Sequence, residues 1–251
     1  MSSSGADEGQ ARPEESVRKA NAAVVAREAA AVLSVDLSDL ALQGRTVQVV
    51  IGLCRAAFAQ SKVIATLAQA DLLAAAAPNR RLLLEIALRL HWLQGLPVTD
   101  RHKAVDTMLA KDRDDTVRLI DYLHDTGHTV DFDPTEMAAF ELDAATKGAI
   151  HQQATRVNAA ARSGEVKPWS LYSMWLTETQ FSHASGFLAG KYAPTHDDSH
   201  MSSGEPDLMD PDLDAHRLIQ LMIVTTTGYL LTEAGVPDEF AGRMGAAFFA
   251  A

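Results

Sequence analysis

The sequence of 251 residues has little of what secreted, zinc-clustered or membrane-spanning proteins need. Its one cysteine, Cys54, can form neither an intrachain disulfide nor a zinc site built from cysteines. Residues 1–15 contain no apolar run and no Arg-rich amphipathic pattern of a targeting peptide. The longest apolar stretch, residues 218–231, is interrupted by polar side chains and is too short to cross a bilayer. We therefore expect a soluble cytoplasmic protein without membrane contact.

Proline and glycine are also scarce, at 9 and 15 residues, and aromatic residues make up 6% of the chain. Apolar residues recur at spacings of three and four instead of alternating, which is typical of helices and not of strands. The pattern predicts an all-α fold, a single-domain helical bundle or array of about seven to eight helices without a β-sheet. The expected helices cover residues 15–34, 45–77, 79–94, 99–124, 133–162, 168–190, 210–234 and 237–249.

Basic residues are outnumbered, with 22 Lys and Arg against 33 Asp and Glu and a net charge of −11. Such a charge disfavours nucleic acid and anionic lipid as partners, because both are bound through basic patches. The acidity is concentrated in residues 1–16 and 192–216, however, and the remaining helical body is nearly neutral. We expect a disordered tail over residues 1–15 and one helical domain over 16–251 with a long acidic loop at 192–211. The neutral body weakens the argument against an anionic ligand or a locally bound nucleic acid.

The segment 79–94 carries the most informative pattern in the chain. One face of this predicted helix is apolar, and two polar stripes cover the rest. Arg81 and Glu85 are four residues apart, so the carboxylate can pair with the guanidinium. Either this stripe faces water, or Arg81 and Glu85 point into a cavity between helices, where Glu85 orients Arg81 toward an anion.

The segment 168–190 could supply the other side of such a cavity. If it is one helix, then Tyr172, Thr179 and His183 share a face, so a phenol, a hydroxyl and an imidazole point the same way. The small residues Ser182, Gly186 and Gly190 recur at intervals of four and would let another helix approach closely. A homodimer through such a face is possible on this pattern.

These motifs resemble a known family. The sequence runs Arg81-Leu-Leu-Leu-Glu85, then Arg89-Leu-His-Trp-Leu, Arg101 after Pro97, Trp169-Ser-Leu-Tyr172 and Phe181-Ser-His183-Ala-Ser185. In this it is similar, over residues 40–231, to the all-helical bacterial family catalogued as domain of unknown function 5677. The family has no settled activity. The resemblance implies that Arg81, Glu85, Arg101, Tyr172 and His183 cluster, and it supplies no substrate.

Three further patterns concern metals, and none of them predicts a metal or a cofactor. His124 and His128 are separated by Gly127 at an expected helix end, and His196 and His200 lie on a loop that would pay the ordering entropy. The aspartates at 210, 212 and 214 start like a calcium loop, but they lack its glycine and its final glutamate, so we interpret them as acids at a helix start.

Three functions from different classes remain open. The first is a pocket that binds a small anionic or polar ligand through Arg81, Glu85, Arg101, Tyr172 and His183. The second is an enzyme, with His183 and Glu85 as candidate catalytic residues of a hydrolase, or with Arg118 and His124 at the spacing of HEPN-type ribonucleases. The third is a structural or interaction protein whose polar residues form a buried network. We favour the first.

Overall fold

The computed structural model describes residues 13–40, 44–129, 141–163, 171–193 and 208–251. These residues form eleven α-helices and two short 3-10 helices and contain no strand, which confirms the predicted all-α fold. The α-helices are α1 (Pro13–Leu33), α2 (Arg45–Gln69), α3 (Ala77–Gly95), α4 (Val98–Asp125), α6 (Ala149–Thr155), α7 (Val157–Ser163), α8 (Leu171–Phe181), α9 (Gly186–Lys191), α10 (Asp214–Glu233), α11 (Asp238–Ala241) and α12 (Arg243–Ala250). Most of the predicted tail and acidic loop lies outside the described residues.

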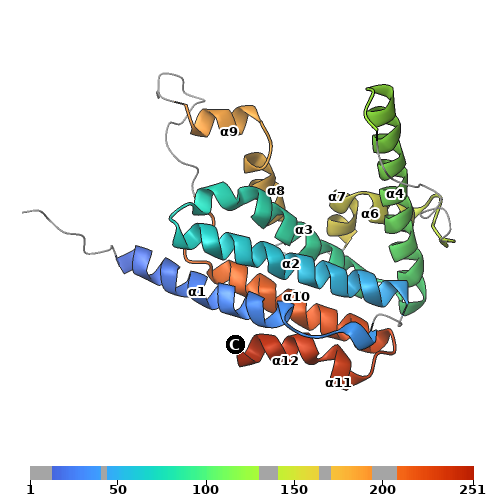
Figure 1. Ribbon diagram of the computed structural model, residues 1–251, viewed down its shortest axis with the longest axis horizontal. Helices are drawn as coiled ribbons and strands as arrows, with labels where there is room; N and C mark the ends of the chain where they lie inside the picture. The colour runs from blue at the N-terminus through green and yellow to red at the C-terminus, as the bar shows by residue number, and fades with distance from the viewer. Residues whose placement is uncertain (1–12, 41–43, 130–140, 164–170, 194–207) are drawn as a thin grey trace, which may run out of the picture.

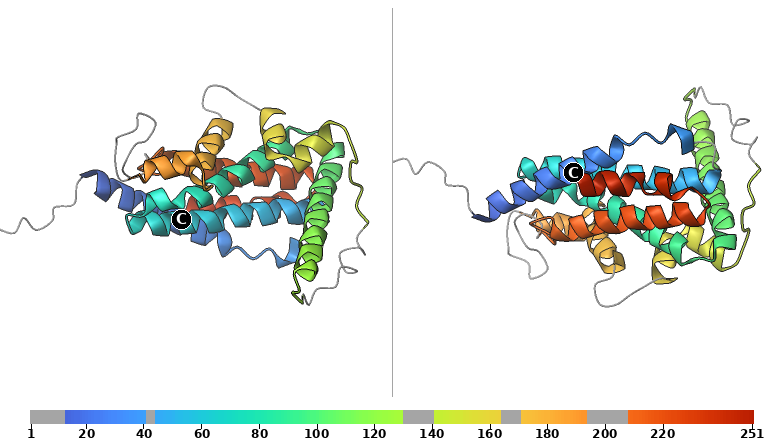
Figure 2. Two further views of the ribbon diagram at one scale, coloured as in Figure 1. Left: turned by 90° about the horizontal axis from the view of Figure 1, so that it is seen from above. Right: turned by 90° about the horizontal axis from the view of Figure 1, so that it is seen from below.

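The long helices α1, α2, α3 and α10 form a bundle, with α12 packed against α1 and α10 (Figure 1). Helix α4 crosses the end of this bundle, and its C-terminal half extends beyond it (Figures 1 and 2). Helices α8 and α7 both pack on α3, and α6 packs on α4. Two helix contacts thus lie at the surface of the bundle, that of α8 with α3 and that of α6 with α4, and the candidate sites described below lie at these two contacts.

The core of the bundle is made of aliphatic residues from all its helices. Phe58 of α2, Leu90 and Leu93 of α3, and Ile223 and Leu231 of α10 are almost completely buried. Helix α2 is also the one helix of the described chain that is long and apolar enough, by length and composition, to cross a membrane. Its buried face packs against α1, α3 and α10, which is the position of a core helix in this bundle.

Several helix ends follow from local chemistry, as the sequence predicts. Pro78 lies in the first turn of α3, where its missing N–H costs no hydrogen bond. Gly127 ends α4 with a positive φ of 82°, and the N–H of His128 donates to the carbonyl of Leu123 at 2.9 Å. Helix α4 begins without a side-chain cap, because Pro97 occupies the cap position.

The helix predicted over 45–77 is wrong at its C-terminal end. Helix α2 stops at Gln69, Asp71 adopts a left-handed conformation with φ 58°, and the N–H of Leu72 donates to the carbonyl of Leu67 at 2.8 Å. Aspartate tolerates this conformation better than most residues. Its carboxylate is also held from α1, because Lys19 Nζ lies 3.0 Å from Asp71 Oδ2.

The helices predicted over 133–162 and 168–190 are each interrupted. The start signals at Asp133 and Pro168 lie outside the described residues. Residues 141–148 are not helical, and the chain resumes as α6 and α7. The later helix breaks after Phe181, and Ser185 caps α9 by accepting the N–H of Leu188 at 3.1 Å. Each break has a consequence for the predicted site.

Candidate functional site

Arg81 and Glu85 lie at the contact between α3 and α8, half-buried and not on a solvent face. Arg81 Nη2 is 3.5 Å from Glu85 Oε2, so the predicted pair forms within α3. Arg81 Nε donates to Thr179 Oγ1 of α8 at 3.3 Å, and its guanidinium lies 5.6 Å from the centre of the Trp175 ring. Arg81 therefore joins the two helices through two contacts, a hydrogen bond and a cation–π contact, while it pairs with Glu85 of its own helix.

Tyr172 belongs to the same place. Its ring stacks on Trp175 at 5.9 Å with an interplanar angle of 17°, and the guanidinium of Arg162 lies 5.8 Å from its centre. The two rings are thus flanked by two cations, Arg81 and Arg162. The structure brings Arg81, Glu85 and Tyr172 together, three of the five residues expected to share a pocket.

Arg101 lies elsewhere. It is buried at the start of α4, where it donates to the carbonyls of Gln94 and Leu96 and pairs with Glu233 of α10 at 2.6 Å. Gln94 is about 20 Å along α3 from Arg81 at 1.5 Å per residue. Arg101 thus ties together the ends of three helices and does not face Arg81.

His183 does not join the cluster either. Helix α8 ends at Phe181, so the helical face shared by Tyr172 and Thr179 stops before it reaches His183. The imidazole is exposed and makes no hydrogen bond to another described residue. The five residues therefore do not form one pocket, and no described residue bonds to the imidazole of His183 as a partner in the proton-transfer role expected of it.

A buried ion pair that the sequence pattern did not predict lies next to this cluster. Arg80 Nε donates to Glu178 Oε1 at 2.7 Å, and the side chains are 13% and 5% exposed. The residues are 98 positions apart, so no local spacing could have paired them. Arg80 thus joins α3 to α8.

His216 of α10 is a second buried polar residue near this pair. Its Nε2 lies 3.1 Å from Ser61 Oγ of α2 in the core. Burial lowers its pKa to about 3, and the positive charge of Arg80 adds to this effect. The imidazole is therefore neutral in the folded protein and serves the packing of α2 on α10.

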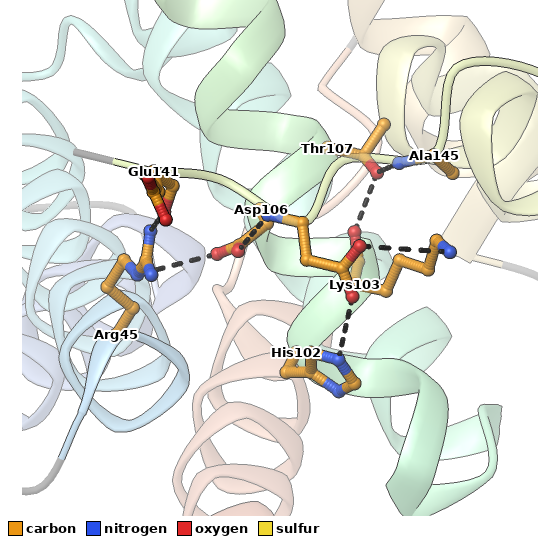
Figure 3. Close-up of polar contacts among 8 residues, drawn as sticks. Arg45, His102, Lys103, Asp106, Thr107, Glu141 and Ala145 are labelled. Carbon is orange, nitrogen blue, oxygen red and sulfur yellow. Dashed lines mark hydrogen bonds and ion pairs between the residues drawn. The ribbon is translucent and has the colours of Figure 1, made fainter. Parts of the chain in front are cut away.

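A pocket that the sequence analysis missed lies between α4 and α6. Its wall is the 141–148 segment, which two buried side chains of α4 hold in place (Figure 3). Asp106 Oδ2 accepts the N–H of Asp143 at 2.8 Å, and Thr107 Oγ1 accepts the N–H of Ala145 at 2.9 Å. Because these N–H groups are bonded to α4, they are not available to a helix over residues 141–148, which explains the break in the predicted helix.

Further contacts fix the same segment at its start. Arg45 of α2 donates to the carbonyl of Glu141 at 2.7 Å and lies 3.5 Å from Asp106 Oδ1 (Figure 3). The carboxylate of Asp143 lies within ion-pair distance of His102 and Lys103. The segment is thus attached to α4 and α2 by both backbone and side-chain bonds.

The cavity behind this segment has a volume of about 510 Å3, within the range of small-ligand sites. It is lined by Thr107, Ala110, Lys111, Asp114, Arg118, Ala144, Ala145, Thr146, His151, Thr155 and Arg156. We call it the α4–α6 pocket. Three of its side chains are cationic and one is anionic, which is unusual in a chain with a net charge of −11.

Arg118 lines this pocket, but its partner in the ribonuclease-like spacing does not. His124 is six residues farther along α4, which places the two side chains about 120° apart around the helix. His124 is exposed and is not among the lining residues. The histidine that shares the pocket with Arg118 is His151, from a different helix.

The described part of the chain contains neither a candidate metal site nor an accessible thiol. Those residues contain no group of three or more His, Cys, Asp and Glu side chains that could hold a metal ion. His196 and His200 lie outside the described residues. Cys54 is buried, and burial raises the pKa of its thiol to about 11, so the thiolate needed for reactivity is disfavoured.

Comparisons with protein-family models, with curated protein sequences and with solved structures give no match. The resemblance to the helical bacterial family therefore stays a prediction, and the site rests on its own geometry.

The buried pair of Arg80 with Glu178 and the half-exposed pair of Arg81 with Glu85 allow a direct comparison. We expect Glu178→Gln to lower the free energy of unfolding by about 3 kcal/mol, because it leaves the charge of Arg80 buried without a carboxylate. Glu85→Gln removes the same charge from a half-exposed pair and should cost less than about 1 kcal/mol. Urea denaturation of both variants measures the difference. Equal losses would contradict the structural role assigned to Glu178.

His216 makes a second prediction, for the dependence of stability on pH. The folded state keeps this imidazole neutral down to about pH 3, whereas the unfolded chain protonates it near its ordinary pKa of 6.5. The unfolded state therefore binds more protons in this window, and unfolding becomes easier as the pH falls. Between pH 7 and pH 5 this group alone should remove about 2 kcal/mol.

The measurement compares urea denaturation of the wild type and of His216→Gln across that range. The variant should lose less stability than the wild type on acidification by about that amount. Replacement of the exposed His183 by Gln is the matched control and should leave the pH dependence unchanged. Parallel curves for the wild type and His216→Gln would contradict the prediction.

Proposed function

We propose that the protein binds a small anionic ligand in the α4–α6 pocket. One observation carries this proposal. Lys111 and Arg118 of α4 and Arg156 at the end of α6 line a single cavity, and Arg156 forms no ion pair with any described residue. Lys111 and Arg118 share one carboxylate, Asp115, which does not line the cavity. An unpaired guanidinium beside two half-neutralised cations suits a phosphate or a carboxylate.

This is the ligand class that the sequence favours, at a different location from the predicted one. The face between α3 and α8 is the second candidate, because the indole N–H of Trp175 is buried there without a partner among the described residues. Arg81 already contacts Thr179 and Trp175, however, and these two contacts hold α8 on α3, while Glu85 pairs with Arg81 within α3. The cations of the α4–α6 pocket form no ion pair with a described residue of another helix. We place this binding protein in the cytoplasm, in keeping with its single cysteine.

Titration calorimetry with inorganic phosphate at low ionic strength tests the proposal. We expect Arg156→Gln to weaken phosphate binding about fivefold, because one exposed charge contact contributes about 1 kcal/mol. Binding should also weaken as salt is added. Lys62→Gln changes the net charge equally on an exposed position of α2 and should leave the affinity unchanged.

Arg81→Gln in the same titration separates the two candidate locations. If this variant loses binding while Arg156→Gln retains it, the ligand belongs to the face between α3 and α8. Absence of phosphate binding by the wild type would contradict the proposal as a whole.

A further inference from the structure

His151 is the side chain that distinguishes the α4–α6 pocket from a simple cluster of cations. Its Nδ1 lies 2.8 Å from the carbonyl oxygen of Ala145. A carbonyl oxygen only accepts hydrogen bonds, so Nδ1 carries the hydrogen and donates it. In the neutral ring, Nε2 then holds a lone pair and can only accept. Nε2 makes no hydrogen bond to another described residue.

The tautomer is fixed by a chain of bonds with assigned directions. The Thr107 hydroxyl donates to the carbonyl of Lys103 at 2.6 Å, and its oxygen therefore accepts the N–H of Ala145. The carbonyl of Ala145 accepts from His151. Because the 141–148 segment is held on α4 in this way, the carbonyl of Ala145 orients the imidazole. A hydrogen bond to one ring nitrogen commonly orients a functional histidine in this manner.

The pocket thus contains acceptors as well as cations. Asp114 and His151 both line it, and Nε2 of His151 is bonded to no described residue. A fully ionised phosphate has no hydrogen to donate to either of these acceptors. A ligand that complements the whole lining carries an anionic group for the cations and hydrogen-bond donors for the two acceptors. Hydroxyl groups fit this requirement better than ammonium groups, because three cations would repel the latter.

We infer that the pocket selects a hydroxylated phosphate ester, such as a phosphorylated polyol or sugar, and that His151 determines this specificity by accepting a ligand hydroxyl. This inference rests on the proposed binding of an anion in the same pocket. His151 reads the hydroxyl, and Arg118 and Arg156 bind the phosphate.

Two phosphate esters that differ in their hydroxyls test the inference by calorimetry at about pH 8, where imidazoles are generally neutral. Glycerol 3-phosphate and propyl phosphate have the same charge and carbon chain length, but only the first has free hydroxyls. We expect the wild type to prefer glycerol 3-phosphate about fivefold to tenfold, the range of one or two hydrogen bonds. His151→Phe should lose most of this preference, because Asp114 is then the one acceptor left of the two, and it should keep the wild-type affinity for propyl phosphate. His124→Phe, at an exposed position of α4 outside the pocket, should keep the preference.

The outcomes separate the two claims. If the wild type binds both esters equally, the specificity inference is wrong and the anion site stands. If His151→Phe keeps the full preference for glycerol 3-phosphate, another group makes the hydroxyl contact. If that variant no longer binds propyl phosphate, His151 has a structural role. Either result overturns the inference. If the wild type binds neither ester, the proposed function fails as well.

Discussion

The pocket depends on the capture of backbone N–H groups by two buried side chains of α4. Asp106 and Thr107 accept the N–H groups of Asp143 and Ala145, and this holds the 141–148 segment on α4 as an irregular wall. If those N–H groups bonded to carbonyls four residues earlier, the segment would be a helix and would not leave the cavity as it stands. The same capture presents the carbonyl of Ala145 to His151 and so fixes the imidazole. Wall, tautomer and ligand complementarity thus follow from one set of buried hydrogen bonds.

The polar residues of this protein fall into two groups that the sequence does not separate. Arg80 and Arg101 are largely buried, and they donate hydrogen bonds to carbonyls and carboxylates of neighbouring segments. Arg118 and Arg156 are exposed at the edge of a cavity, and their side chains join no two of the described helices. Arg118 bonds within α4, to a backbone carbonyl and a carboxylate, and Arg156 forms no ion pair with a described residue. Substitution of a buried arginine of the first kind, or of its partner, leaves a buried charge without a counter-charge. Such substitutions are therefore expected to lower the free energy of unfolding. Under the proposed function, substitutions of the second kind of arginine are expected to change ligand binding.

Much of the fold could be predicted from local sequence, because helix periodicity and the ends at Pro78 and Gly127 depend on neighbouring residues alone. The wrong boundaries have causes beyond the reach of such patterns. Asp71 leaves the helical conformation while an α1 lysine holds its carboxylate, and residues 141–148 give their N–H groups to α4. For the site, the spacing of Arg81 and Glu85 predicted their pairing correctly. It could not reveal that α8 ends before His183, nor that a pocket forms where distant segments meet.

The proposed ligand site lies between α4 and α6 and not between α3 and α8. Amide chemical shifts of the 15N-labelled protein, recorded while inorganic phosphate is added, test this most directly, because they report the location of binding without a mutation. The account predicts that the shifts change at residues 107–118 and 144–156, with saturation at a common affinity. Changes confined to the amides of residues 79–85 and 171–181, or no saturable changes at all, would contradict it.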